Sequence, residues 1–197
     1  MRMKVHMAID TPNGTAEGAS VIALQYSRAP AWFPSGTGNR NGVRVIGEAP
    51  HVDLGYGRTL FMLIEDPWGG RPQMMALGNL LSAKPEGGEL RERDVPTLVT
   101  FRDPARVTSI VRVDPTNPSA TLGAGYTLRR IWIEPTTEKP RFGLVERVLP
   151  FRSVLEQPGV QRIERDGTKT SLTYPPPNDA RWISWSAFQQ GGSSPSK

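Results

Sequence analysis

The opening residues of the chain alternate between apolar and polar side chains, and this pattern most limits what the chain can fold into. One face of an extended strand would carry Met3, Val5, Met7 and Ile9, and the other face Arg2, Lys4, His6 and Asp10. A period of two is typical of a strand with one buried face. Asn13-Gly14 follows, and this dipeptide favours a tight hairpin turn. We therefore predict an N-terminal β-hairpin whose returning strand carries Ile22, Leu24 and Tyr26 on one face.

Further strand candidates follow along the chain. They are 43–55 and 58–66, which we predict to pair with each other, and then 97–101, 108–114 and 126–134. Leu60 to Ile64 is continuously apolar, which indicates a central strand covered on both faces. Pro72 precedes Met74, Leu77 and Leu81 at helical spacing, which predicts a short helix over the sheet.

Glycine and proline strengthen the β-rich interpretation. The 20 Gly and 19 Pro residues occupy about a fifth of the 197 positions, against about 12% in an average globular protein, and favour short strands and turns. The predicted fold class is mainly β, as a β-sandwich or a partly open barrel with one or two short helices; an α+β sheet is the alternative. We place a β-rich globular domain at residues 1–152, a C-terminal extension packing on it at 153–190, and a disordered tail at 191–197.

Charge and cysteine content exclude several classes of function. The chain has 24 basic and 19 acidic residues, and because its net charge of +5 is not concentrated in any segment, we predict no specific nucleic-acid binding. The absence of cysteine excludes disulfides, cysteine-ligated zinc, iron–sulfur clusters and thiol nucleophiles. We expect no cofactor and no metal site.

The N-terminal segment lacks the apolar core of a signal peptide, because alternation follows Arg2 and Lys4. No run of about 18 consecutive apolar residues is present, so the sequence predicts a soluble domain without a transmembrane helix. A membrane would be reached only through a leader or anchor that this sequence does not contain.

One loop carries the residue types of a reactive site. His51 and Asp53 precede Gly55 and Gly57, and residues two apart share a strand face, where a carboxylate raises the basicity of an imidazole. A hydrolase or small-ligand site centred on this pair is therefore one hypothesis. The alternative, favoured by the lack of an identifiable nucleophile, is a hairpin turn in which Asp53 pairs with Arg58 or in which both bond the turn backbone.

The strand candidate at 126–134 presents an aromatic residue between charges. If its isoleucines face the core, then Arg130, Trp132 and Glu134 project from the other face. A Trp exposed between Arg and Glu is typical of a binding hot spot. The ring could instead pack beneath the helix or the C-terminal extension, against Trp182 and Trp185.

A second candidate surface is the Gly- and Pro-rich loop at 28–42. Trp32 and Phe33 are its only large apolar residues. Such a loop either packs the pair back on the core or offers it to a partner. Both surfaces favour protein partners as the interaction class.

Four segments of the chain are distinctive: "VDLGYGRTLFMLI", "FRDPARVTSIVRVDP", "LGAGYTLRRIWIEPT" and "GLVERVLPF". Together they resemble an uncharacterised family of bacterial, chiefly proteobacterial, proteins whose members often begin with a membrane anchor or leader. The resemblance covers residues 3–151 and implies an envelope location facing the periplasm, with no known activity. Family members have Thr where this chain has Trp132 and Pro135, and a Trp near Phe151, so the chain departs from the family at a candidate surface.

The sequence leads to three hypotheses of function. The first is a non-catalytic binding or accessory protein in a bacterial envelope or another multiprotein assembly. The second is the hydrolase or small-ligand domain around His51 and Asp53. The third is a virion or assembly protein whose flexible loop and tail wrap its neighbours. The compartment is periplasmic or envelope-associated if the resemblance holds and cytoplasmic otherwise, and the oligomeric state stays open.

Overall fold

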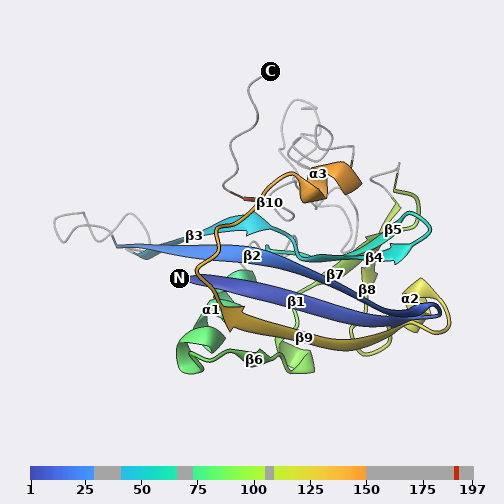
Figure 1. Cartoon of the computed structure of the whole chain (residues 1–197), viewed down its shortest axis with the longest axis horizontal. Helices are drawn as coiled ribbons and strands as arrows, with labels where there is room; N and C mark the ends of the chain where they lie inside the picture. The colour runs from blue at the N-terminus through green and yellow to red at the C-terminus, as the bar shows by residue number, and fades with distance from the viewer. Residues whose placement is uncertain (29–40, 66–72, 105–108, 150–188, 191–197) are drawn as a thin grey trace, which may run out of the picture.

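Two antiparallel β-sheets pack face to face in the computed structural model, which describes residues 1–28, 41–65, 73–104, 109–149 and 189–190 (Figure 1). The chain is mainly β, as predicted, and the open sandwich is the observed form of that class rather than a closed barrel or an α+β sheet. A shared apolar core lies between the sheets.

The larger sheet has six strands in the order β10-β3-β2-β1-β9-β6. Their bounds are β1 Arg2–Thr11, β2 Gly14–Arg28, β3 Asn41–Glu48, β6 Gly88–Glu89, β9 Thr127–Pro135 and β10 Gln189–Gln190. The predicted N-terminal hairpin is confirmed: Arg2 pairs with Ala23 and Thr11 with Gly14. The C-terminal part of the chain reaches this sheet at Gln189–Gln190, which pairs with the end of β3.

The smaller sheet has four strands in the order β4-β5-β7-β8. Their bounds are β4 His51–Gly55, β5 Arg58–Met62, β7 Leu98–Phe101 and β8 Ile110–Val113. The prediction that 43–55 forms one strand paired with 58–66 is wrong in its first half. Residues 41–48 instead form β3 and pair with β2, and only His51–Gly55 pairs with β5.

The helices are short and lie outside the sheets. Their bounds are α1 Gln73–Ala83, α2 Ser119–Leu122, α3 Leu144–Val148 and the 3₁₀ turn η1 Glu92–Asp94. The predicted helix is confirmed as α1, which buries Met74, Leu77 and Leu81 in the shared core. In the described part of the chain no helix has the length and apolarity needed to cross a bilayer.

The four-stranded sheet is covered on both faces. Leu60 and Met62 of β5 belong to the core between the sheets. Phe61 and Leu63 belong to a second core on the opposite face, where Val145 of α3 packs on them. All residues from Leu60 to Ile64 are fully buried, and β5, which contains Leu60 to Met62, lies between β4 and β7, so the prediction of a central strand is confirmed for that part of the apolar run.

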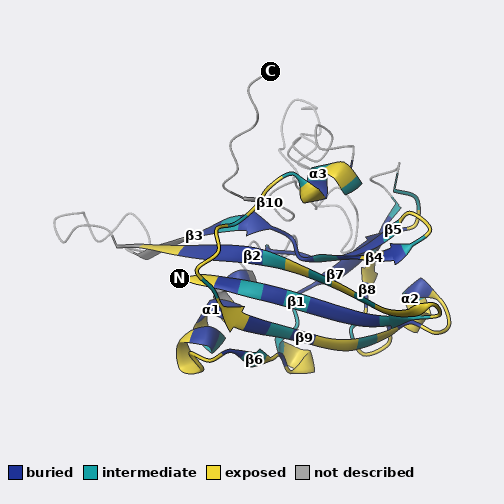
Figure 2. Cartoon of the chain, viewed as in Figure 1, coloured by how far each residue is buried: buried dark blue, intermediate teal, exposed yellow. Residues whose placement is uncertain are grey.

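The six-stranded sheet has one buried face and one face whose residues are partly buried or exposed. Met3, Val5 and Met7 of β1 are fully buried in the shared core, whereas Lys4 and His6 between them are only partly covered. Figure 2 shows buried and less buried residues alternating along β1 and β9. We call the partly exposed face of β1, β2 and β9 the outer face.

The chain passes from one sheet to the other at residues 49–50, next to a close contact between the two layers. A methyl group placed on Gly18 of β2 would come within 1.8 Å of the backbone oxygen of His51 in β4. The absence of a side chain at Gly18 therefore allows the two backbones to approach each other.

Candidate functional site

The outer face of β9 carries the three residues predicted to project from it. Ile131 and Ile133 are 2% and 1% exposed in the shared core. Arg130 and Glu134 are exposed on the opposite face, and Trp132 between them is half-buried. The predicted alternation along this strand is confirmed.

Trp132 is held by two neighbours on this face. The antiparallel register places His6 of β1 directly opposite Trp132. The two rings are stacked with centroids 4.4 Å apart and planes 6° apart, and the guanidinium carbon of Arg130 lies 4.2 Å from the Trp132 ring centroid. Stacking and cation–π contacts each favour this arrangement. The indole ring is thus held in one orientation by its neighbours within the chain.

Glu134 completes the group by contacting His6. Its Oε1 atom lies 3.0 Å from His6 Nε2, and the side chains are 48% and 18% exposed respectively. The sequence placed His6 on the polar face of β1, but did not reveal that it would be largely covered there. We call His6, Arg130, Trp132 and Glu134 the Trp132 cluster.

A β-bulge in β9 places a second arginine, Arg129, beside this cluster, where its guanidinium lies 3.6 Å from Asp10 Oδ1. Ala8 pairs with Arg130 but Ile9 pairs with Leu128, so Arg129 has no cross-strand partner. Arg129 is exposed next to Arg130, and its guanidinium donates a hydrogen bond to Thr15 Oγ1 at 3.1 Å. Simple alternation would have turned Arg129 inward; the bulge places two consecutive arginines outward.

The loop after β4 is a structured turn. Gly55 and Gly57 have φ angles of 79° and 71°, and Tyr56 between them has a φ of 54°. The Asp53 carboxylate accepts a hydrogen bond from the Gly55 N–H at 2.8 Å, whereas His51 Nδ1 lies 3.2 Å from the Ala49 carbonyl oxygen. His51 and Asp53 therefore make separate local contacts, and the turn interpretation describes their geometry.

The prediction that Arg58 pairs with Asp53 or bonds the turn backbone is wrong. Arg58 does not bridge the turn to Asp53. Its guanidinium instead donates hydrogen bonds to the Leu122 carbonyl oxygen at 3.0 Å and to the Tyr126 hydroxyl at 2.6 Å. These contacts connect β5 to the last residue of α2 and to the residue just before β9, far along the sequence.

The remaining candidates lie in other parts of the chain. Trp32 and Phe33, like Trp182 and Trp185, fall outside the described residues. Within the residues that the structure describes, no group of three or more His, Asp or Glu side chains is arranged to hold a metal ion.

Comparison of the chain with protein-family models, curated proteins and solved structures gave no match. The resemblance of the four sequence segments to an envelope family therefore stays a prediction. The Trp132 cluster must be interpreted from its own geometry.

Proposed function

We propose that this chain is a non-catalytic protein-binding domain whose binding surface is the Trp132 cluster on the outer face of β1 and β9. The observation that carries the proposal is the position of Trp132: half-buried on a sheet face, stacked on His6 and placed beneath the Arg130 guanidinium.

This arrangement has the physical properties of a binding hot spot. Trp and Arg are enriched among the residues that contribute most to protein interfaces. A ring already held in place loses less conformational entropy on binding than a mobile one. Arg130 and Glu134, both exposed, offer hydrogen-bonding groups of opposite charge at the edge of the ring.

The setting that we propose is a multiprotein assembly of the bacterial envelope. Its support is the resemblance of segments 52–64, 101–115, 122–136 and 143–151 to an envelope family. The Trp132 cluster supports the binding role independently of that setting, because its geometry does not depend on the compartment.

Affinity capture with the tagged full-length chain from its native host tests the proposal. We expect quantitative mass spectrometry to recover a reproducible partner with the native chain and to lose it with Trp132→Ala. The substitution removes the aromatic surface and leaves the buried isoleucines on either side unchanged.

Tyr56→Asn is the matched control. Tyr56 is an 87% exposed aromatic on the β4–β5 turn, and Asn tolerates its positive φ angle. The variant should recover the same partner as the native chain. Equal recovery of every partner by Trp132→Ala, or loss of the partner from both variants, would contradict the proposed surface.

A further inference from the structure

A segment of the chain crosses the outer face beside the Trp132 cluster. Residues 136–142, which we call the strap, run from the end of β9 past the N-terminus to α3 (Figure 1). The first part of the strap is fastened to β1: the Arg2 guanidinium donates to the Thr137 carbonyl oxygen at 3.0 Å, and Lys4 Nζ lies 3.0 Å from Glu138 Oε1.

The far end of the strap is fastened by a buried carboxylate. Glu48, at the end of β3, is 1% exposed. It accepts hydrogen bonds from the backbone N–H groups of Gly143, Leu144 and Val145. Gly143 has a φ of 94°, which a side chain would disfavour. Both ends of the strap are therefore fixed to the sheet.

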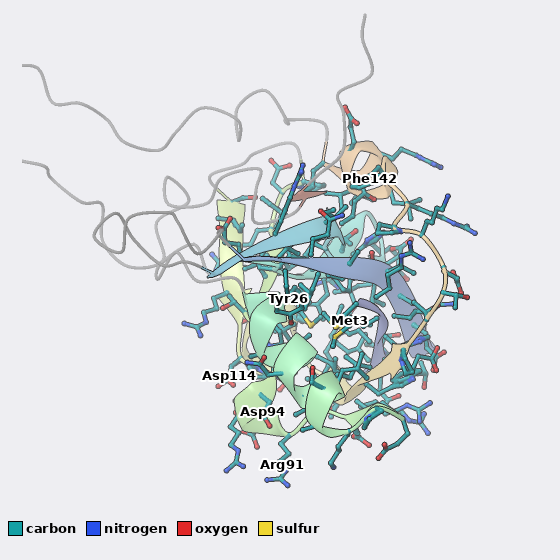
Figure 3. The ribbon with its side chains drawn as sticks, turned by 90° about the vertical axis from the view of Figure 1, so that its left-hand side faces the viewer. Met3, Tyr26, Arg91, Asp94, Asp114 and Phe142 are labelled. Atoms are coloured by element: carbon teal, nitrogen blue, oxygen red, sulfur yellow. The ribbon has the colours of Figure 1, made fainter. Side chains whose placement is uncertain are left out.

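Between these fixed ends the strap borders a half-open pocket of about 450 Å³. Ser20 and Val21 of β2 form part of its wall, together with Leu144. This volume lies within the range of small-molecule sites, about 300–1,000 Å³. Figure 3 shows Phe142 beside α3 at the surface, next to the part of the strap that borders the cavity.

The cavity has a small positive charge. Its ionisable lining groups are Lys4, Arg141 and Glu138, so two positive charges and one negative charge leave a net charge of +1. The hydrogen bond from Lys4 lowers the pKa of the Glu138 carboxyl below its ordinary value, so this group carries its negative charge at neutral pH with or without the shift. Arg141 is exposed and donates no hydrogen bond to any described residue, and its positive charge contributes to lowering the pKa of Glu138. Among the described residues, its hydrogen-bond donors are therefore unused.

We propose that this cavity binds a small organic monocarboxylate with a short apolar body. The planar guanidinium of Arg141 matches a carboxylate in a bidentate geometry. Val21, Ala19 and Leu144 provide apolar contacts for the hydrocarbon part. Glu138 repels a second negative charge, which disfavours phosphate and dicarboxylates. This site does not depend on the protein-binding role of the Trp132 cluster.

Calorimetric titration of the full-length chain with hexanoate tests this inference. We expect saturable binding that weakens about 10-fold or more in Arg141→Gln, because a hydrogen-bonded charged partner is removed. Lys139→Gln is the matched control: it removes a neighbouring exposed charge of the same strap that does not line the cavity. Hexan-1-ol and inorganic phosphate should both bind at least about 10-fold more weakly than hexanoate.

Four results would overturn the inference. They are no saturable hexanoate binding, unchanged affinity in Arg141→Gln, an equal loss in Lys139→Gln, and tighter binding of phosphate than of hexanoate. Thermal unfolding of both variants alongside the titration shows that each remains folded, so that a loss of affinity reports the site itself.

Discussion

The two sheets of this molecule use their faces differently. The four-stranded sheet is buried on both sides at its centre, with Phe61 in one core and Leu60 in the other. The six-stranded sheet buries one side and leaves Arg130, Trp132 and Glu134 on a partly open face. The difference follows from sequence: the run from Leu60 to Ile64, which begins in β5, is continuously apolar, whereas β1 and β9 alternate. The smaller sheet therefore has more of its residues in the cores, and the larger one carries the surface for which we propose a binding role.

The largest expected effect separates these two roles directly. Phe61→Ala should lower the free energy of unfolding by about 4 kcal/mol, since it empties a fully buried site. Trp132→Ala should cost only about 1 kcal/mol, because its ring is half-buried against neighbours on the outer face. Urea denaturation of both variants measures the difference. Similar losses would show that the outer face is as structural as the core.

Glu48 provides a second comparison, between buried and exposed carboxylates of the same sheet. Glu48→Ala should destabilise the chain by about 3 kcal/mol, because the N–H groups that begin α3 lose their acceptor. Glu89→Ala, at an exposed position in β6, should change stability by less than about 0.5 kcal/mol. Chemical denaturation measures both. Comparable losses of unfolding free energy in the two variants would show that Glu48 does not fasten the end of the strap.

Gly18 tests how closely the two sheets must approach. Gly18→Ala should cost about 2 kcal/mol, because the added methyl group meets the His51 backbone rather than a movable side chain. Ala19→Ser, at the next and exposed position of β2, serves as the control. Thermal unfolding compares them. If Gly18→Ala is as stable as the native chain, the two sheets can move apart at this point without a loss of folding free energy.

The smallest expected effect concerns pH and the strap. Because the hydrogen bond from Lys4 lowers the pKa of Glu138 below its ordinary value of 4.5, the pair stabilises the fold above that pH. Its contribution is lost as the pH falls further through the lowered pKa. Lys4→Gln should therefore lower the urea midpoint slightly at pH 7 and less at pH 3. A difference that persists or grows at pH 3 would contradict the pairing.

Local sequence patterns predicted the elements well because burial in a strand or helix follows a short period. The hairpin at Asn13-Gly14, the buried run in β5, the helix carrying Met74 and the outward position of Trp132 all depend on residues close together in sequence. In each of these cases, the residues that determine the structure belong to a single strand, helix or turn.

Long-range pairings could not be predicted in the same way. The pairing of His6 with Trp132 joins strands more than 120 residues apart, and Arg58 reaches Tyr126 rather than its neighbour Asp53. The β-bulge at Arg129 and the buried role of Glu48 also depend on distant backbone groups. The candidate site was therefore predicted in its β9 half and missed in its β1 half.

The affinity of the purified captured partner for the native chain and for Trp132→Ala is the measurement that tests the central claim most directly. If the outer face of the six-stranded sheet is the binding surface, Trp132→Ala should weaken the complex by about 30-fold, which corresponds to a hot-spot contribution of about 2 kcal/mol. An affinity within about threefold of the native value would show that the partner binds elsewhere and would contradict the account.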